Sequence, residues 1–297
     1  MCFIEEKGKF LTIHKRYQHF GYFCYMTFLR QLLNFYINSS IHVALSVFSL
    51  TWITLLSLDL SYSESVLYFV FYASITGYNF VKYFGVAKFR HRRLANWLKL
   101  IQILSFICFI LMCYYAIKLK LNTHIFIFCF ALLTVLYAIP VFSKKNNTLR
   151  NIGGLKVYII ALVWTGVTVF IPLINSNYSI DSDVVILGAQ RFLYVLVLML
   201  PFEIRDLKYD NLKLSTIPQK LGLKKTKGLG VLFLVIVFLL EFFKNTTNEG
   251  YIVVLLIVLI ITGFFVFFSK IEQQKYYSSF WVESLPILWL ILLLYFN

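Results

Sequence analysis

Long apolar stretches alternate with short polar connections along almost the whole chain. A helix needs roughly 20 predominantly apolar residues to cross the hydrocarbon core of a bilayer. The run 20–29 is too short to span and is typical of a helix at the membrane surface. The pattern predicts nine membrane-spanning helices, at residues 41–60, 66–86, 98–117, 124–142, 155–174, 184–202, 228–244, 250–269 and 280–296.

The composition agrees with this division into spans and connections. Of the 297 residues, 60% are hydrophobic and 14% are charged, against about 25% charged in soluble domains. A soluble fold could not bury so much apolar surface, so lipid must cover part of it. We therefore predict an all-α, polytopic transmembrane bundle, with a cytoplasmic or interfacial segment at 1–40 and a single transmembrane domain at 41–297.

The basic residues are sorted by connection. Of the 28 lysines and arginines, 24 lie in the N-terminal segment or in every second connection after it, and three lie on the other side. The positive-inside rule then places the N-terminus in the cytoplasm and the C-terminus outside. This sorting accounts for the net charge of +15 without a nucleic acid as partner. We predict a multi-pass protein of the cell inner membrane.

Three acidic residues share one helix face at the cytoplasmic end of the sixth predicted span. Glu203, Asp206 and Asp210 are spaced i, i+3, i+7, in a chain with only 13 acidic residues. Clustered carboxylates repel unless a cation joins them, and Mg²⁺ takes oxygen ligands while keeping positions open for phosphates. These three residues are therefore candidate metal ligands. Arg205 and Lys208 could instead neutralise them as ordinary surface pairs.

Segment 201–222 resembles the second aspartate-rich motif of the UbiA superfamily of intramembrane prenyltransferases. Glu203 takes the first acidic place, Asp206 and Asp210 take the other two, and positions 215–216 and 221–222 also match. A glycine usual in the turn of this motif is missing. The resemblance implies catalytic roles for Asp206 and Asp210, contact between Arg205 and a substrate diphosphate, and Mg²⁺ as cofactor.

A second resemblance to the same family lies at the cytoplasmic end of the fourth span. Residues 136–145 and 149–154 hold a tyrosine, a proline and a basic cluster ahead of a glycine pair. In the family the tyrosine and lysine lie near the diphosphate. The resemblance thus implies catalytic roles for Tyr137 and Lys144, and diphosphate binding by Lys144. The alternative is membrane-edge anchoring by an aromatic residue and snorkelling lysines.

The first aspartate-rich motif of the family is degenerate in this chain. Asn79 matches, but Phe80, Tyr83 and Ala87 stand where the three aspartates belong. In one account cations replace the metal, and Asn79 and Lys82 bind the diphosphate directly. In the other, the reaction is lost or changed. The basic run 82–93 also fits cytoplasmic topology and attraction to anionic lipids.

One further cation, Arg191, lies inside a predicted span. Charged side chains in the membrane are costly and usually have a partner or a functional role. We expect a structural ion pair with Asp181 or Asp183.

The resemblance implies a prenyltransferase with an isoprenoid diphosphate and a lipophilic, in particular aromatic, acceptor as substrates. The diphosphate would lie at the cytoplasmic face with its tail among membrane lipids. Two alternatives stay open: a UbiA-like protein with lost or altered catalysis, and a transporter or structural membrane protein. The enzyme hypothesis requires the acidic face and the basic positions to line one cytoplasm-facing cavity.

Overall fold

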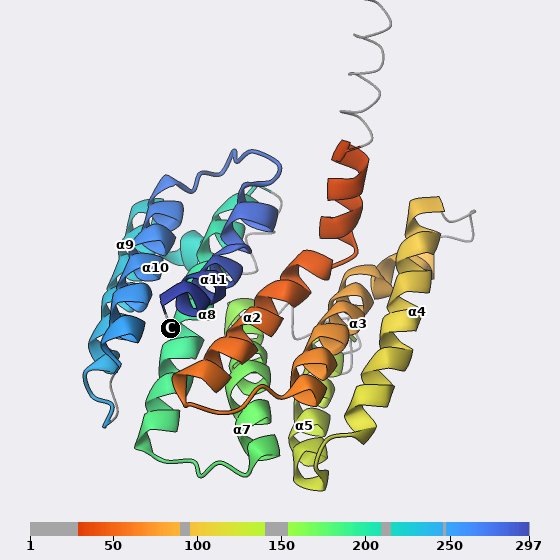
Figure 1. Cartoon of the computed structure of the whole chain (residues 1–297). Helices are drawn as coiled ribbons and strands as arrows, with labels where there is room; N and C mark the ends of the chain where they lie inside the picture. The colour runs from red at the N-terminus through yellow and green to blue at the C-terminus, as the bar shows by residue number, and fades with distance from the viewer. Residues whose placement is uncertain (1–28, 90–95, 140–153, 209–214, 246–247, 297) are drawn as a thin grey trace, which may run out of the picture.

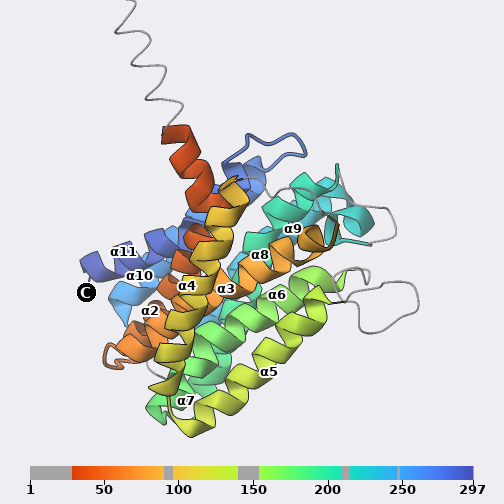
Figure 2. The same ribbon diagram turned by 90° about the vertical axis from the view of Figure 1, so that its right-hand side faces the viewer.

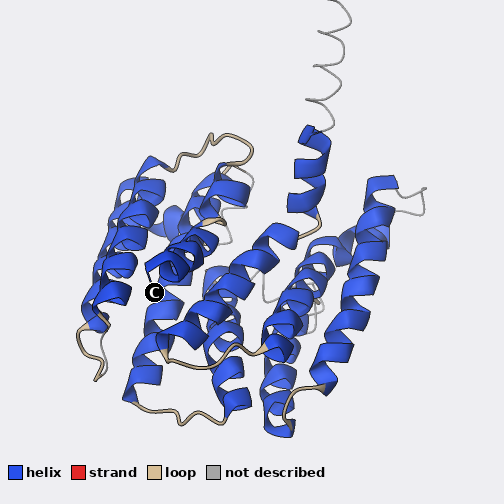
Figure 3. Cartoon of the chain, viewed as in Figure 1, coloured by secondary structure: helices blue, strands red, loops and turns tan. Residues whose placement is uncertain are grey.

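A computed structural model of the chain describes residues 29–89, 96–139, 154–208, 215–245 and 248–296. These residues form helices and loops, with no strand among them (Figure 3), so the all-α prediction is confirmed. A short helix over Leu29–Asn38 comes first. It is followed by α2 (Ile41–Ser57), α3 (Glu64–Phe89), α4 (Asn96–Ile117), α5 (Leu121–Ala138), α6 (Leu155–Thr165), η2 (Gly166–Phe170), α7 (Ile171–Ser176), α8 (Ser182–Asp206), α9 (Ile217–Glu241), α10 (Glu249–Phe268), η4 (Tyr277–Val282) and α11 (Leu285–Phe296).

Within the described residues, each predicted span falls on one helix or on one continuous run of helices. Among the described residues, six helices are long and apolar enough to cross a membrane, or seven if Leu29–Asn38 and α2 form one bent span. The chain is thus a multi-pass membrane protein, and the count of nine spans stays a prediction. Helices α3 and α9 fall short of the criterion, and both carry lysines inside their bounds.

The helices pack around a centre formed by α2 and α8. Helix α2 packs on α3 and α11, whereas α8 packs on α9 and α6 (Figures 1 and 2). Fully buried Leu50, Tyr194 and Val258 join α2, α8 and α10 in the main core. Helices α4 and α5 leave large side chains such as Phe106 and Phe128 exposed, as lipid-facing helices do.

Several breaks shape this bundle. The Leu29–Asn38 helix meets α2 at an angle of 57°. The π-helix η2 interrupts the α6–α7 rod at Gly166, where a Cβ would overlap the Phe130 ring of α5. A second π-helix, η4, leads into α11. Single π turns inside helices are frequent at functional sites because they re-aim the residues around them.

Helix α8 joins the two ends of the bundle. It begins at the cap residue Asp181, whose side chain accepts a hydrogen bond of 3.0 Å from the Val184 backbone. It ends at Asp206, next to the start of α6 at Leu155. We call the end that holds Asp206 the basic end, because Lys156, Arg205, Lys208 and Lys275 lie there, and the other the opposite end.

Candidate functional site

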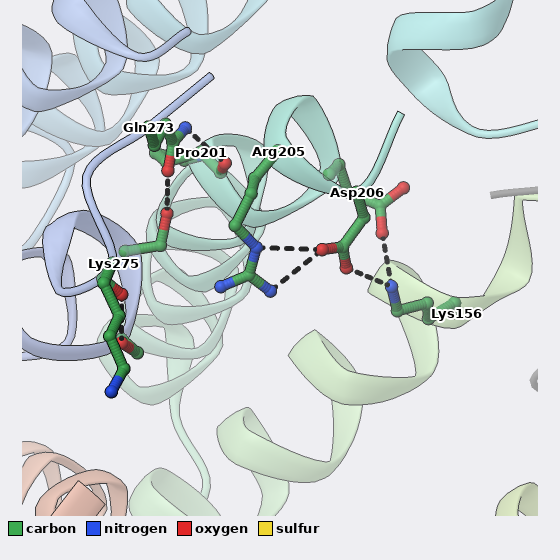
Figure 4. A network of polar contacts seen from close by, with 9 residues as sticks. Lys156, Pro201, Arg205, Asp206, Gln273 and Lys275 are labelled. Carbon is green, nitrogen blue, oxygen red and sulfur yellow. Dashed lines mark hydrogen bonds and ion pairs between the residues drawn. The ribbon is translucent and has the colours of Figure 1, made fainter. Parts of the chain in front are cut away.

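Four charged side chains form a chain across the start of α6 and the last turns of α8. The Lys156 ammonium lies 3.0 Å from Glu203 Oε1 and 3.3 Å from Asp206 Oδ2. The other Asp206 oxygen, Oδ1, accepts from Arg205 Nε at 2.9 Å and lies 2.8 Å from Arg205 Nη2. Figure 4 shows Lys156 and Arg205 on opposite sides of Asp206. We call Lys156, Glu203, Asp206 and Arg205 the ionic relay.

A close backbone contact places Lys156 in the relay. Gly154, the cap residue of α6, has a φ of 75°. A Cβ at Gly154 would lie 3.1 Å from the backbone oxygen of Ser215. The two segments that carry the family resemblance, around Gly154 and around Ser215, therefore touch in the folded chain. Glycine is suited to this position because other residues pay for a left-handed backbone.

Arg205 also lines a pocket of about 460 Å³ at the basic end, within the usual size range of small-ligand sites. The other charged residues around this pocket are Lys208, Lys275 and Glu272. Lys208 and Glu272 are 3.8 Å apart and strongly exposed, so their pairing contributes little. Arg205 is paired with Asp206, and the two lysines outnumber Glu272, so the pocket has a net positive charge and is suited to an anion.

Hydrogen bonds beside this pocket attach the loop after α10 to α8 and to the Leu29–Asn38 helix. Gln273 Nε2 donates to the carbonyl oxygen of Pro201 in α8 at 2.9 Å (Figure 4). Asn34 Oδ1 accepts from Lys275 Nζ at 2.6 Å and from Tyr276 Oη at 2.9 Å. The loop after α10 and the Leu29–Asn38 helix are thereby attached next to the end of α8.

The predicted site residues are only partly brought together. Asp206 and Arg205 lie in the relay, as does Glu203. Tyr137 is buried at the end of α5 and interacts electrostatically with Lys156. Asp210 and Lys144 lie outside the described residues.

The two predicted diphosphate contacts on α3 have different surroundings. The Asn79 amide is buried and donates to the Ser39 carbonyl oxygen at 2.9 Å and to Ser105 Oγ at 2.8 Å. Its oxygen accepts from Ser40 Oγ at 2.8 Å, so this side chain joins α2, α3 and α4. Lys82 is exposed and donates to the Asn38 carbonyl oxygen at 3.1 Å.

Sequence reasoning did not single out Lys156, Gln273 or Glu283. Glu283 follows η4, and its carboxylate interacts electrostatically with both Lys82 and Arg205. The one sequence signal for Glu283 was its position inside the predicted span 280–296, because a charged side chain is costly in a membrane. For Lys156 the signal was its position two residues after the glycine pair 153–154.

Two of the three predicted magnesium ligands, Glu203 and Asp206, lie in the described part of the chain and share a lysine as partner. The Lys156 ammonium lies between Glu203 and Asp206, where a divalent ion bridging them would lie. Within the described ranges, no group of three or more His, Cys, Asp or Glu side chains could hold a metal ion. Because the third ligand, Asp210, falls outside those ranges, its part in a magnesium site stays a prediction.

The opposite end of α8 holds a second polar cluster. Glu241 Oε2 lies 2.7 Å from Lys244 Nζ and accepts from Gln190 Nε2 at 2.9 Å, and both ions of this pair are almost fully buried. A pocket of about 450 Å³ beside it is lined by Asp59, Asp183, Glu241 and Lys244, among others.

The ion pair expected for Arg191 is not found. Arg191 is 1% exposed and donates to neutral acceptors: the Leu50 carbonyl oxygen at 2.7 Å, Thr54 Oγ1 at 3.2 Å and Thr168 Oγ1 at 3.3 Å. No ion pair within the described ranges includes it. The expectation was wrong because both aspartates have other partners. Asp181 caps α8 by accepting from the Val184 backbone, and Asp183 accepts from the Asn245 side chain.

No known family profile matches the chain, and no curated protein matches it. Among solved structures, the chain is similar to digeranylgeranylglyceryl phosphate synthase, a UbiA-type prenyltransferase described in membranes. The similarity has a TM-score of 0.54, covers 90% of this chain and 97% of that one, and comes with 18% sequence identity. At this identity the comparison establishes a shared fold.

Proposed function

We propose that the protein is a membrane-embedded prenyltransferase of the UbiA type, which transfers an isoprenoid chain from its diphosphate to a lipophilic acceptor. The observation that carries the proposal is the ionic relay beside an anion-suited pocket at the basic end. The fold shared with a prenyltransferase supports it. So does the contact between Gly154 and Ser215, which joins the two segments that resemble the family.

In this proposal the diphosphate lies against Arg205, in the pocket that Lys208 and Lys275 also line. Arg205 donates hydrogen bonds that strengthen as negative charge develops on the leaving group. The allylic C–O bond breaks, and its electron pair leaves with the diphosphate. An electron-rich atom of the acceptor forms the new bond to the same carbon and loses its proton to the medium.

The apolar interior suits a prenyl tail and a short-lived carbocation. Tyr78 Oη accepts from Trp164 Nε1 at 2.6 Å, which joins α3 to α6 within the bundle. The Tyr78 and Trp164 rings also meet edge to face, and Tyr78 interacts electrostatically with Tyr137. Ring faces stabilise cations while excluding water that would otherwise capture them.

The direct test offers purified protein geranyl, farnesyl and geranylgeranyl diphosphate with phenolic and glycerol-phosphate acceptors. Each mixture is run with Mg²⁺ and with EDTA, and products are identified by mass spectrometry together with released diphosphate. We expect a prenylated acceptor with one substrate pair, and loss of product in Arg205→Ala. Absence of both product and diphosphate binding in all mixtures would exclude the proposal.

A second candidate function is prenyl-diphosphate binding without standard transfer. It is favoured by Phe80 and Tyr83, which stand at two acidic positions of the first family motif. Tyr83 Oη donates to the Asn38 carbonyl oxygen at 2.9 Å, so it has a structural contact. Saturable binding of a prenyl diphosphate, with no product from any acceptor and no diphosphate release, would distinguish this function from transfer.

A further inference from the structure

Lys156 and the two carboxylates it contacts are placed against the helix dipoles. Glu203 and Asp206 lie in the last turn of α8, where the helix end is already negative. Lys156 lies in the first turn of α6, where the helix end is positive. Each charge is unfavourable for its own helix, so the stability of the individual helices does not account for this arrangement.

Burial makes the arrangement costly unless the charges compensate one another. The side chain of Glu203 is 3% exposed, and those of Lys156 and Asp206 are 22% and 23% exposed. A buried carboxylate without a cation is strongly disfavoured. Lys156 supplies that cation from another helix, and together with Arg205 it brings the four side chains to zero net charge.

A divalent metal and the Lys156 ammonium would compete for the same place. Mg²⁺ binds carboxylate oxygens at about 2.0–2.1 Å and requires near-octahedral geometry. Lys156 Nζ already contacts one oxygen of each carboxylate, and Arg205 engages the remaining Asp206 oxygen. On α3, the positions that would supply further carboxylates hold Phe80 and Tyr83.

We propose that Lys156 is a resident cation that takes the place of a divalent metal between Glu203 and Asp206. It is a positioning residue: through Asp206 it fixes the Arg205 guanidinium at the edge of the anion-suited pocket. Diphosphate binding then depends on Arg205 and its neighbouring lysines and does not require Mg²⁺. This inference rests on the proposed function, since it concerns binding of the same diphosphate.

The first experiment measures Mn²⁺ binding by electron paramagnetic resonance, with no substrate present. Wild-type protein and Lys156→Arg should bind no Mn²⁺ at this site at micromolar metal. Lys156→Ala removes the cation between the two carboxylates and should bind about one ion. Lys220→Ala, which removes an exposed lysine of α9, is the matched control and should behave as wild type. Equal Mn²⁺ binding by wild type and Lys156→Ala would overturn the inference.

The second experiment measures binding of tritiated geranylgeranyl diphosphate in EDTA and in Mg²⁺. Wild-type affinity should change less than threefold between the two conditions. Lys156→Ala should lose at least tenfold affinity in EDTA and regain most of it in Mg²⁺, which a purely structural role would not produce. If Lys156→Ala does not fold, the wild-type affinities in Mg²⁺ and in EDTA are sufficient to test the inference. Tenfold tighter binding by wild type in Mg²⁺ than in EDTA would contradict it. Absence of wild-type binding in both conditions would instead reject the proposed function.

Discussion

The two ends of α8 hold similar residue types in opposite circumstances. At the opposite end, Arg191, Glu241 and Lys244 are almost fully buried and are bonded to other protein groups, although Glu241 and Lys244 also border a pocket. At the basic end, the side chain of Arg205 is 36% exposed and lines a pocket. A buried cluster whose charges are paired holds helices together, whereas a partly exposed one retains hydrogen-bond donors for a ligand. Residue type and spacing alone do not separate the two.

The largest effect on stability should come from neutralising an acid in the polar cluster at the opposite end. This change tests whether that cluster holds the helices together. Glu241→Gln leaves the Lys244 ammonium buried without its carboxylate. Removing one partner of a buried pair costs about 3–5 kcal/mol, so the free energy of unfolding should fall by that amount. The measurement is reversible unfolding in detergent.

The control for that change is Glu249→Gln, which alters an exposed acid in the first turn of α10. Loss of a favourable charge–dipole contact there should cost less than about 1 kcal/mol. If the two variants have equal stability, the opposite-end cluster does not hold the helices together and the contrast between the two ends fails.

A smaller effect should follow from changing the backbone contact that places Lys156. Gly154→Ala puts a side chain at a φ of 75° and 3.1 Å from the Ser215 oxygen. The left-handed backbone alone costs roughly 1–2 kcal/mol, and the relay should be displaced with it. Thermal unfolding and diphosphate affinity should therefore both decrease.

Gly228→Ala serves as the comparison, because Gly228 lies in α9 and a Cβ there would meet nothing within 4 Å. Alanine in a helix interior should stabilise by roughly 0.5–1 kcal/mol relative to glycine. A Gly154→Ala protein as stable as Gly228→Ala, with unchanged affinity, would show that this contact does not position the relay.

The smallest expected effect concerns the hydroxyl of Tyr137, which is buried near the relay. Loss of one hydrogen-bonding group is worth about 1 kcal/mol, so Tyr137→Phe should weaken diphosphate binding by about fivefold or less. If Tyr137 has the catalytic role implied by the family resemblance, the transfer rate should fall further than binding does. Equal decreases in the two would assign it to binding alone.

The apolar pattern predicted the helices well because membrane helices satisfy their own backbone groups and follow hydropathy directly. The shared face of Glu203 and Asp206 was also readable, since i and i+3 positions of a helix face the same way. The partner of these acids was not readable. Lys156 is 47 residues before Glu203, and their contact depends on how α6 packs against α8.

Roles for polar residues inside the spans were harder still to predict. Asn79 matched a family motif in sequence, yet its amide hydrogen-bonds to three serines. Arg191 was expected to find a carboxylate, but two threonines and a backbone carbonyl accept its hydrogen bonds. Sequence spacing cannot distinguish these outcomes, because each depends on which helices become neighbours.

The central claim is that the diphosphate binds at the basic end, and the Kd for geranylgeranyl diphosphate tests it most directly. Three proteins are compared: wild type, Arg205→Ala, and Asp59→Asn. Asp59 lines the opposite pocket, and its φ of 51° is one that asparagine tolerates. Loss of charge-assisted hydrogen bonds should weaken binding roughly 10- to 100-fold in Arg205→Ala, whereas Asp59→Asn should stay within about twofold of wild type. Weaker binding by Asp59→Asn than by Arg205→Ala, or unchanged binding in both, would contradict the account.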